Sequence, residues 1–404
     1  MCATVSISND RAGGATCRHH SVASLIFMAA ASHPLRRSPT NPSCSPNRAE
    51  RLLSLCAGRC GPARFPTNAP MTPTPNPAAD STDVEWPLDD TSLYGTLVSP
   101  SGPGPFPAAV MVAGSGPTDR DWNTPLLPGT NGSARLLADA FARVGIASLR
   151  YDKRASGAHA RENMQRLVGK VSMQSHVDEL AGAVRILSSN PRVRRDRIFA
   201  VANSEGTLHA MRYQLQQPKQ ALAGLVLIAP PGRVIGDLAR SQLAAQLAPL
   251  PTGNAMLALY DAAIARFAAG EPVAPDPSLL PGIQALLQSL ATPANLPFAR
   301  ELWTTDGALL LSQIDVPTLV VIGQKDVQVD WQADGERLQL AAAGRGGVTF
   351  TFPEHANHVL KHESRPRAEL HGAQVGATYN AEDATLDPEA THAIIQWLTA
   401  LGAD

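Results

Sequence analysis

Short apolar runs alternate with longer helical patterns along most of this chain, from Val84 onward. Continuous runs of β-branched and other apolar residues predict strands that are buried on both faces, and the longer periodic segments predict amphipathic helices that cover them. The pattern therefore predicts an α/β fold with a mostly parallel central sheet and helices on both faces. Strands are expected at 108–113, 146–151, 198–202, 225–229, 318–322 and 348–352, and helices at, among others, 133–143, 174–188 and 206–217.

The alternation is interrupted once, between the strand that ends near Ala229 and the strand that starts at Thr318. More than eighty residues rich in Ala, Leu, Gln and Pro lie between them, and a simple crossover connection needs far fewer. We expect residues 232–312 to form a helical cap inserted into a core made of 84–231 and 313–404. An insertion after the carboxyl end of a strand lies at the edge where such sheets bind ligands.

The first 80 residues differ from the rest in composition. Residues 1–70 hold eight arginines against two acidic residues, and they contain all five cysteines of the chain. The apolar run at 24–31 is short for a signal-peptide core and follows a long, weakly basic stretch. We expect 1–80 to be a disordered leader and linker, and the protein to be cytoplasmic, or secreted or periplasmic if this segment acts as a signal. Met71 is an alternative first residue.

Composition narrows the function classes. Of the 404 residues, 44% are hydrophobic and 17% are charged, with a net charge of −1. This apolar content is ample for a packed core, and near-neutral charge argues against binding of nucleic acid through its phosphates. Since no stretch of eighteen apolar residues occurs, no membrane span is expected. The oligomeric state stays open.

A serine lies where the strand expected at 198–202 gives way to a helix. A strand, a tight turn holding a serine, and a helix form the context of a nucleophile elbow, in which the serine hydroxyl is exposed at the sheet edge. Small residues are needed two positions before and after this serine, because helix and strand nearly touch there. Ala202 and Gly206 occupy those positions around Ser204. Ser204 is therefore the predicted nucleophile.

A serine hydroxyl needs a base to accept its proton, and the base needs a carboxylate to orient it. In this architecture the acid follows the serine in the chain and the histidine comes last. Asp326 follows the strand expected at 318–322 and is the predicted acid, with Asp330 as the alternative. After the next strand, His358 is the predicted base, with His355 as the alternative.

An oxyanion formed at the serine needs two N–H donors. The backbone N–H of Glu205, directly after the nucleophile, is one candidate, and that of Ser115 in the Gly-Ser-Gly-Pro segment after the first parallel strand is the other. A phosphate-binding interpretation of that segment fails, because a third glycine is missing and Pro117 lacks an N–H. We expect the neighbouring charged residues to pair with one another and brace this loop, namely Asp119, Arg120, Asp121, Asp152 and Arg154.

Four segments together resemble a known family: 114–121 (Gly-Ser-Gly-Pro-Thr-Asp-Arg-Asp), 150–157 (Arg-Tyr-Asp-Lys-Arg-Ala-Ser-Gly), 203–206 (Asn-Ser-Glu-Gly) and 357–358 (Asn-His). Over roughly 85–402 the chain resembles a mostly bacterial branch of the α/β-hydrolase superfamily, related to dienelactone-hydrolase-like and prolyl-oligopeptidase-like serine hydrolases. The resemblance implies a serine hydrolase with a lid, without a metal or other cofactor, that usually acts on esters. Ser204, Asp326 and His358 match the nucleophile, acid and base of that family.

Two positions depart from the family pattern: Asn203 stands where histidine is common, and Ala155 stands where glycine is usual. The sequence predicts hydrolysis of a small-molecule carboxylic ester through an acyl-enzyme intermediate. The same triad could serve a peptidase, a thioesterase or an acyltransferase, because the discriminating residues lie in the cap and loops. A binding module with an inactive hydrolase fold is the alternative from another class, and the intact order of serine, aspartate and histidine counts against it.

Overall fold

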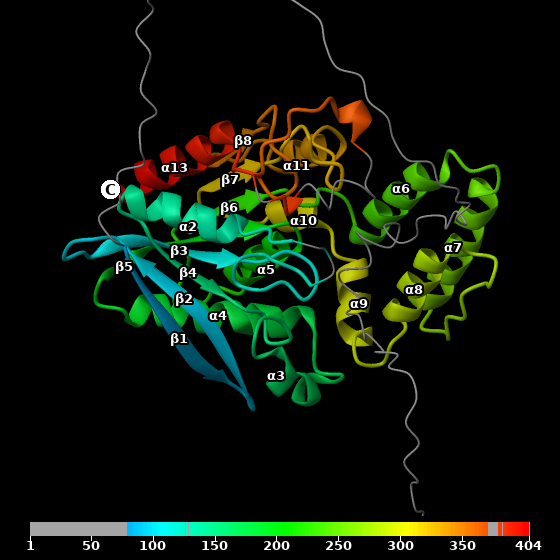
Figure 1. The fold of residues 1–404 in the computed structure, drawn as a ribbon, viewed down its shortest axis with the longest axis horizontal. Coiled ribbons are helices and arrows are strands. Elements are labelled where there is room, and N and C mark those ends of the chain that lie inside the picture. The colour runs from blue at the N-terminus through cyan, green and yellow to red at the C-terminus, as the bar shows by residue number, and fades with distance from the viewer. Residues whose placement is uncertain (1–78, 126, 128, 371–378, 382, 404) are drawn as a thin grey trace, which may run out of the picture.

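The strands of the described chain form one eight-stranded sheet (Figure 1). The computed structural model describes residues 79–403, apart from 126, 128, 371–378 and 382. The strands are β1 (Asp80–Leu88), β2 (Thr91–Ser99), β3 (Phe106–Val112), β4 (Ala147–Tyr151), β5 (Val193–Asn203), β6 (Gly224–Ile228), β7 (Thr318–Val321) and β8 (Val348–Thr351). Their order across the sheet is β1-β2-β4-β3-β5-β6-β7-β8.

The sheet is parallel except at one side. Strand β2 pairs antiparallel with β1 and with β4, and all pairings from β4 through β3 to β8 are parallel. Each of the six strands predicted from apolar runs lies in this sheet, which confirms the predicted fold class. Because the strands run parallel, their carboxyl ends meet at one edge, and the loops that leave this edge lie close together.

The hairpin of β1 and β2 was not predicted. Its register runs from Asp80 opposite Ser99 to Leu88 opposite Thr91, and the turn between the strands contains Asp89 with a φ of 54°. Most of β1 is exposed, so it lacks the continuous apolar run that marks the inner strands. Edge strands with one solvated face give this weaker signal.

Helices cover both faces of the sheet. They include α2 (Ser133–Arg143), α3 (Ala160–Leu167), α4 (Met173–Ser189), α5 (Glu205–Leu215), α11 (Ala333–Ala341) and α13 (Pro388–Ala403). Figure 1 shows α2 and α13 on one side of the sheet and α4 and α5 on the other. Helix α2 has its predicted bounds, and α4 and α5 differ from theirs by one or two residues at each end. Ser172 caps α4, where its side chain accepts the N–H of Ser175, so the helix begins at a fixed position.

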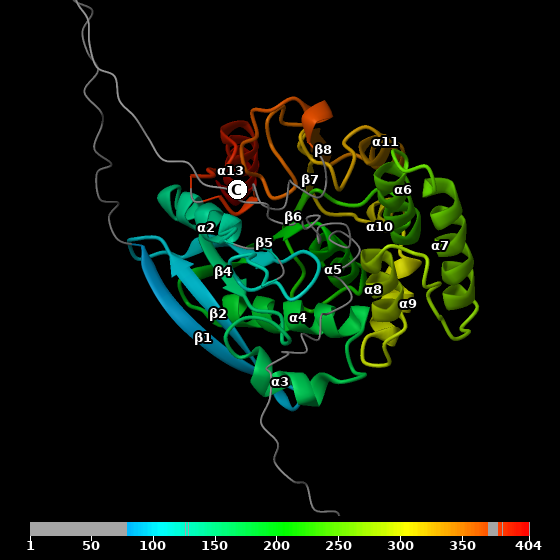
Figure 2. The ribbon, with the colours of Figure 1, turned by 45° about the vertical axis from the view of Figure 1, so that its right-hand side comes forward.

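Five helices lie between β6 and β7: α6 (Ile235–Leu247), α7 (Gly253–Ala268), α8 (Pro281–Leu290), α9 (Leu296–Trp303) and α10 (Gly307–Leu311). Helices α6 to α9 stand together beside the sheet in both views (Figures 1 and 2), and α10 packs against α5 and α11. Buried aromatic rings contribute to the packing of these helices. The rings of Phe267 in α7 and Trp303 in α9 pack edge to face, with their centroids 6.2 Å apart.

Within the described part of the chain, no helix has both the length and the apolar character needed to cross a bilayer. Of the predicted leader and linker, 1–80, residues 1–78 with the five cysteines lie outside the described residues, and Asp80 is already the first residue of β1.

Candidate active site

Ser204 lies at a sharp turn between the end of β5 and the start of α5. Its φ of 53° and ψ of −124° place a residue with a side chain in a region that only glycine adopts readily. Such strain is characteristic of functional sites. The Ser204 N–H donates to the carbonyl of Ile228 at 2.8 Å. A Cβ on Gly206 would lie 2.5 Å from the Ala113 carbonyl oxygen, so only glycine fits there, whereas the Ala202 methyl group is accommodated in the core.

The predicted acid and base are in direct contact. Nδ1 of His358 lies 2.8 Å from Oδ2 of Asp326, and both side chains are buried. The other carboxylate oxygen accepts the N–H groups of Gln328 at 2.7 Å and Val329 at 3.0 Å. Because a carboxylate oxygen accepts hydrogen bonds, Nδ1 is the donor in this contact, and in the neutral imidazole Nε2 then carries the lone pair. That is the tautomer a general base requires.

Asn203 connects the loop that carries His358 to the serine turn. Its side-chain N–H donates to the His358 carbonyl at 3.0 Å. On the other side, the hydroxyl of Ser133 at the start of α2 donates to the Val359 carbonyl at 2.8 Å. Asn203, one of the two residues that depart from the family pattern, therefore holds the base loop (353–361) beside the turn.

The two alternative residues lie in different surroundings. Asp330 is ion-paired with Arg367 at 2.7 Å and accepts the N–H groups of Gln332 and Ala333 at the start of α11. The side chain of His355 is 42% exposed, and its Nε2 lies 4.0 Å from the carboxylate of Glu354. Among the candidate acids and bases, the pair in hydrogen-bond contact is Asp326 with His358.

Gly323 allows the acid loop (323–330) to touch the base loop. A Cβ at this position would overlap the carbonyl oxygen of Ala356, which also accepts the Lys325 N–H at 3.1 Å. We expect Gly323→Ala to lower the free energy of unfolding by about 1–3 kcal/mol, because a methyl group forced into a filled space displaces its neighbours. Urea denaturation measures this loss. The control is Gly346→Ala, where a Cβ meets nothing within 4 Å; an equal loss in both variants would contradict the steric explanation.

The two candidate oxyanion donors lie on segments that flank the serine. Glu205 is the first residue of α5, and the first N–H groups of a helix have no partner within it. The other segment, the glycine loop (114–117), approaches closely: a Cβ on Gly114 would lie 3.2 Å from the Cβ of Ser204. The loop is held in a turn by Thr118, whose hydroxyl donates to the Ser115 carbonyl at 2.7 Å.

Charged residues brace the chain after the glycine loop, as the sequence predicts. The backbone N–H and the guanidinium of Arg120 both donate to Asp152 at 2.7 Å. Arg150 is ion-paired with Asp121. Asp119 accepts the N–H of Asp121 at 2.9 Å, and burial raises the pKa of its carboxyl group. These contacts link the loop to the end of β4.

The prediction that Arg154 braces the glycine loop is wrong, because its buried partner is a residue of α4. Its Nε donates to Oε1 of Glu179 in α4 at 3.0 Å, and Oε2 of Glu179 lies 3.1 Å from Nδ1 of His176. Burial by itself raises the pKa of Glu179, but His176 and Arg154 together hold it at about 2. This pair anchors the loop after β4 to α4 rather than to the glycine loop.

Sequence reasoning missed a buried cluster next to the serine turn. Nζ of Lys153 and Nε2 of His209 each lie 3.2 Å from Oε1 of Glu205. Burial raises the pKa of Glu205, but the Lys153 ammonium and His209 hold it well below its usual range. The spacing of Glu205 and His209, four residues apart on one helix, is a signal that they share a face. Nothing local indicates that Lys153 joins them.

Within the described chain, one group of side chains could hold a metal ion, and it consists of His176, Glu205 and His209. One ligand atom from each lies within 4.8 Å of the others. The ammonium of Lys153 already lies beside the carboxylate of Glu205, and a second cation there would be repelled by it in a site of low dielectric constant.

His209 should make stability depend on pH. Burial lowers its pKa to about 4, against about 6.5 in the unfolded chain. Between these values the unfolded state binds a proton that the folded state does not, so stability falls as pH falls through this window. We expect a loss of about 2 kcal/mol between pH 6.5 and 4.5, measured by urea denaturation. In His209→Gln this part of the slope should vanish; an unchanged slope would contradict the assignment.

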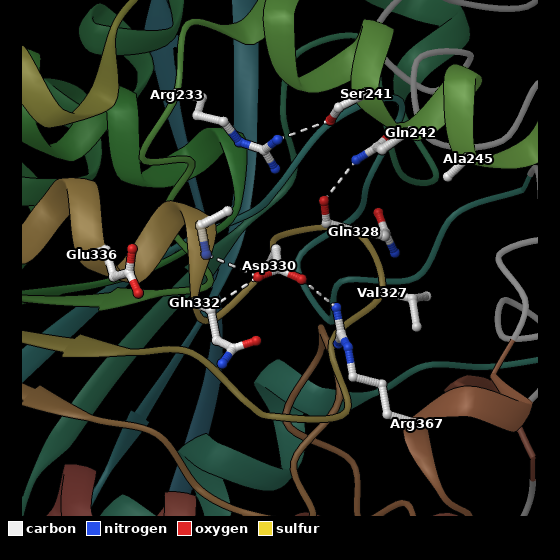
Figure 3. A pocket seen from close by; sticks show the side chains of 11 residues that line it. Arg233, Ser241, Gln242, Ala245, Val327, Gln328, Asp330, Gln332, Glu336 and Arg367 are labelled. Atoms are coloured by element: carbon white, nitrogen blue, oxygen red, sulfur yellow. Dashed lines mark hydrogen bonds and ion pairs between the residues drawn. The ribbon is translucent and has the colours of Figure 1, made fainter.

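A cavity of about 600 Å³ lies beside the acid loop (Figure 3). The cavity is lined by Val327 and Gln328 of the acid loop, by residues of α6 and α11, by Asp330 and Gln332 directly before α11, and by Arg367. Figure 3 shows Arg367 directed at Asp330, and the Gln242 amide, from α6, directed at the Gln328 carbonyl. The three candidate catalytic side chains do not line this cavity. It therefore borders the acid side of the site and the helices that follow β6.

The chain has identifiable relatives. It is 26% identical over 268 residues to the esterase EstD of Thermotoga maritima, which covers 66% of this chain and 58% of that protein. Among solved structures, an esterase of Pyrococcus furiosus is 16% identical over 80% of this chain and 92% of its own, with a TM-score of 0.48. A dienelactone hydrolase of Anabaena variabilis is 15% identical over 80% and 96%, with a TM-score of 0.41.

The profile of the alpha/beta hydrolase family matches residues 109–373. This span includes the serine turn, the acid loop and the base loop. It is more than half of the chain, and it agrees with the sheet order and with the strand–serine–helix turn. The chain belongs to the alpha/beta hydrolase family.

Proposed function

We propose that this protein is a serine hydrolase that cleaves carboxylic ester bonds of small molecules through an acyl-enzyme intermediate. The observation that carries the proposal is the 2.8 Å hydrogen bond between the buried side chains of Asp326 and His358. His358 belongs to the base loop, which Asn203 holds beside the turn of Ser204. The similarity to an esterase over 66% of this chain supports esters as the substrate class.

In the first half-reaction, the Ser204 hydroxyl attacks the ester carbonyl carbon while Nε2 of His358 takes its proton. Asp326 orients the imidazole and stabilises the imidazolium that forms. The negative charge that develops on the carbonyl oxygen is stabilised by the N–H groups of Ser115 and Glu205. Collapse of the tetrahedral intermediate expels the alcohol, which receives the proton from His358.

In the second half-reaction, water attacks the acyl-enzyme and His358 again acts as the base. The oxyanion donors act a second time, and the carboxylic acid leaves as the Ser204 hydroxyl is restored. All of these groups belong to the chain itself.

We propose that residues 232–312 form the cap that selects the substrate. The segment follows the carboxyl end of β6, at the edge of the sheet that carries the site. Its first helix is tied to the acid loop by a hydrogen bond from the Gln242 amide to the Gln328 carbonyl at 2.7 Å. Side chains of this cap would then decide which acyl group and alcohol fit.

Substrate panels and an activity-based probe test the proposal together. We expect wild-type protein to react with a fluorophosphonate and to hydrolyse p-nitrophenyl esters faster than matched thioesters or aminoacyl-anilides. Faster turnover of the anilides or thioesters would keep the triad and replace the substrate class. No labelling and no turnover of any panel member would favour a binding module.

A further inference from the structure

We propose that Lys153 is a positioning residue that fixes both oxyanion donors in one geometry, an inference that rests on the proposed serine-hydrolase function. The residue lies in the loop after β4 and is 5% exposed, and its ammonium binds the glycine loop and Glu205 rather than the candidate triad. Its ammonium lies between the two segments that flank Ser204.

The ammonium meets three acceptors. Nζ donates to the carbonyl of Gly114 at 2.5 Å and lies 3.4 Å from the carbonyl of Gly116 and 3.2 Å from Oε1 of Glu205. An ammonium group has three N–H donors, so these contacts match its full capacity. One side chain thereby joins the glycine loop to the first residue of α5.

The bond to Gly114 acts directly on the Ser115 donor. The Gly114 carbonyl and the Ser115 N–H belong to one planar peptide group. Fixing the direction of the carbonyl therefore fixes the direction of the N–H on the opposite side. A cation at the carbonyl oxygen also polarises the amide, which strengthens its N–H as a donor.

The bond to Glu205 acts on the second donor. The Glu205 side chain is held by Lys153 and by His209, and the whole residue is 3% exposed. Because its backbone N–H is the other candidate donor, the carboxylate anchors that donor relative to the glycine loop. Preorganised donors of this kind cost no rearrangement when charge develops.

The positive charge at Glu205 is thus assigned to lysine and not to a metal ion held with His176 and His209. A divalent cation bound to this carboxylate would lie next to an ammonium that has no other acidic partner within the described part of the chain. The two assignments differ in what chelators and metal analysis would find.

The test compares Lys153→Met with the double variant Lys153→Met/Glu205→Gln, which removes both charges and so leaves no unpaired buried ion. In both variants we expect kcat for a p-nitrophenyl ester to fall by about 10- to 100-fold. This decrease is no larger than the decrease expected when an oxyanion donor is removed outright. KM should change by less than about threefold, because the donors bind the uncharged ester carbonyl of the ground state more weakly than the oxyanion of the transition state.

Two inhibitors separate positioning from general damage. A trifluoromethyl ketone forms a tetrahedral oxyanion on the serine, and its Ki should weaken by the same factor as kcat. The matching alcohol binds without an oxyanion, and its Ki should stay unchanged. Arg154→Met removes a neighbouring buried cation that contacts Glu179 and not the glycine loop; it should lower Tm and keep kcat within about twofold of wild type.

Unchanged kcat in folded Lys153→Met, or equal weakening of ketone and alcohol, would overturn the inference while leaving the proposed function in place. Stoichiometric zinc in the purified protein, with activity lost on chelation, would overturn it in favour of a metal at Glu205. Wild-type protein that neither hydrolyses esters nor reacts with a fluorophosphonate would overturn the proposed function and this inference with it.

Discussion

Ser204→Ala should lower kcat/KM for p-nitrophenyl esters by about 10⁴-fold or more, because the variant lacks the attacking oxygen. The fold should be unaffected. Alanine keeps the Cβ that serine already places at a φ of 53°, so the backbone strain is the same. Steady-state kinetics measures the loss, and fluorophosphonate labelling should disappear in parallel.

Ser148→Ala is the matched control for this variant. Like Ser204, Ser148 in β4 is buried, and its hydroxyl has no hydrogen-bond partner among the described residues. Its removal should leave both stability and kcat close to wild type. Near-full esterase activity in Ser204→Ala would remove the proposed mechanism, whatever the control does.

Asp326→Asn should lower kcat by about 10⁴-fold through the wrong histidine tautomer. One carboxylate oxygen accepts the N–H groups of Gln328 and Val329, so in asparagine the carbonyl oxygen must stay on that side. The NH₂ group then faces Nδ1 of His358. Nδ1 must accept, its proton moves to Nε2, and the ring can no longer take the proton of the serine.

Asp330→Asn is the control, because sequence alone leaves that residue as the alternative acid. It should lose its ion pair with Arg367 and little activity, within a few-fold of wild type. Steady-state kinetics at neutral pH decides between the two. A large loss in Asp330→Asn with a small one in Asp326→Asn would exchange their roles.

The features that the sequence determined by itself are local or depend on chain order. Runs of apolar residues are long enough to identify six strands: five are inner strands that are largely buried, and the sixth, β8, is a partly exposed strand at the edge of the sheet. The turn at Ser204 is signalled by its neighbours, because Gly206 must be small where helix and strand meet. The order of serine, acid and histidine follows from the order of the parallel strands that carry them.

The tertiary structure decided what depends on contacts between distant segments. The structure brings the carboxylate of Asp326, and not that of Asp330, to His358, and it joins the side chains of Asn203 and Lys153 to carbonyl groups that lie far away in the sequence. A polar residue shows its type in the sequence but not its partner. Partners are set when the carboxyl ends of the strands meet at one edge, because burial there requires each charge and each N–H to find a specific acceptor.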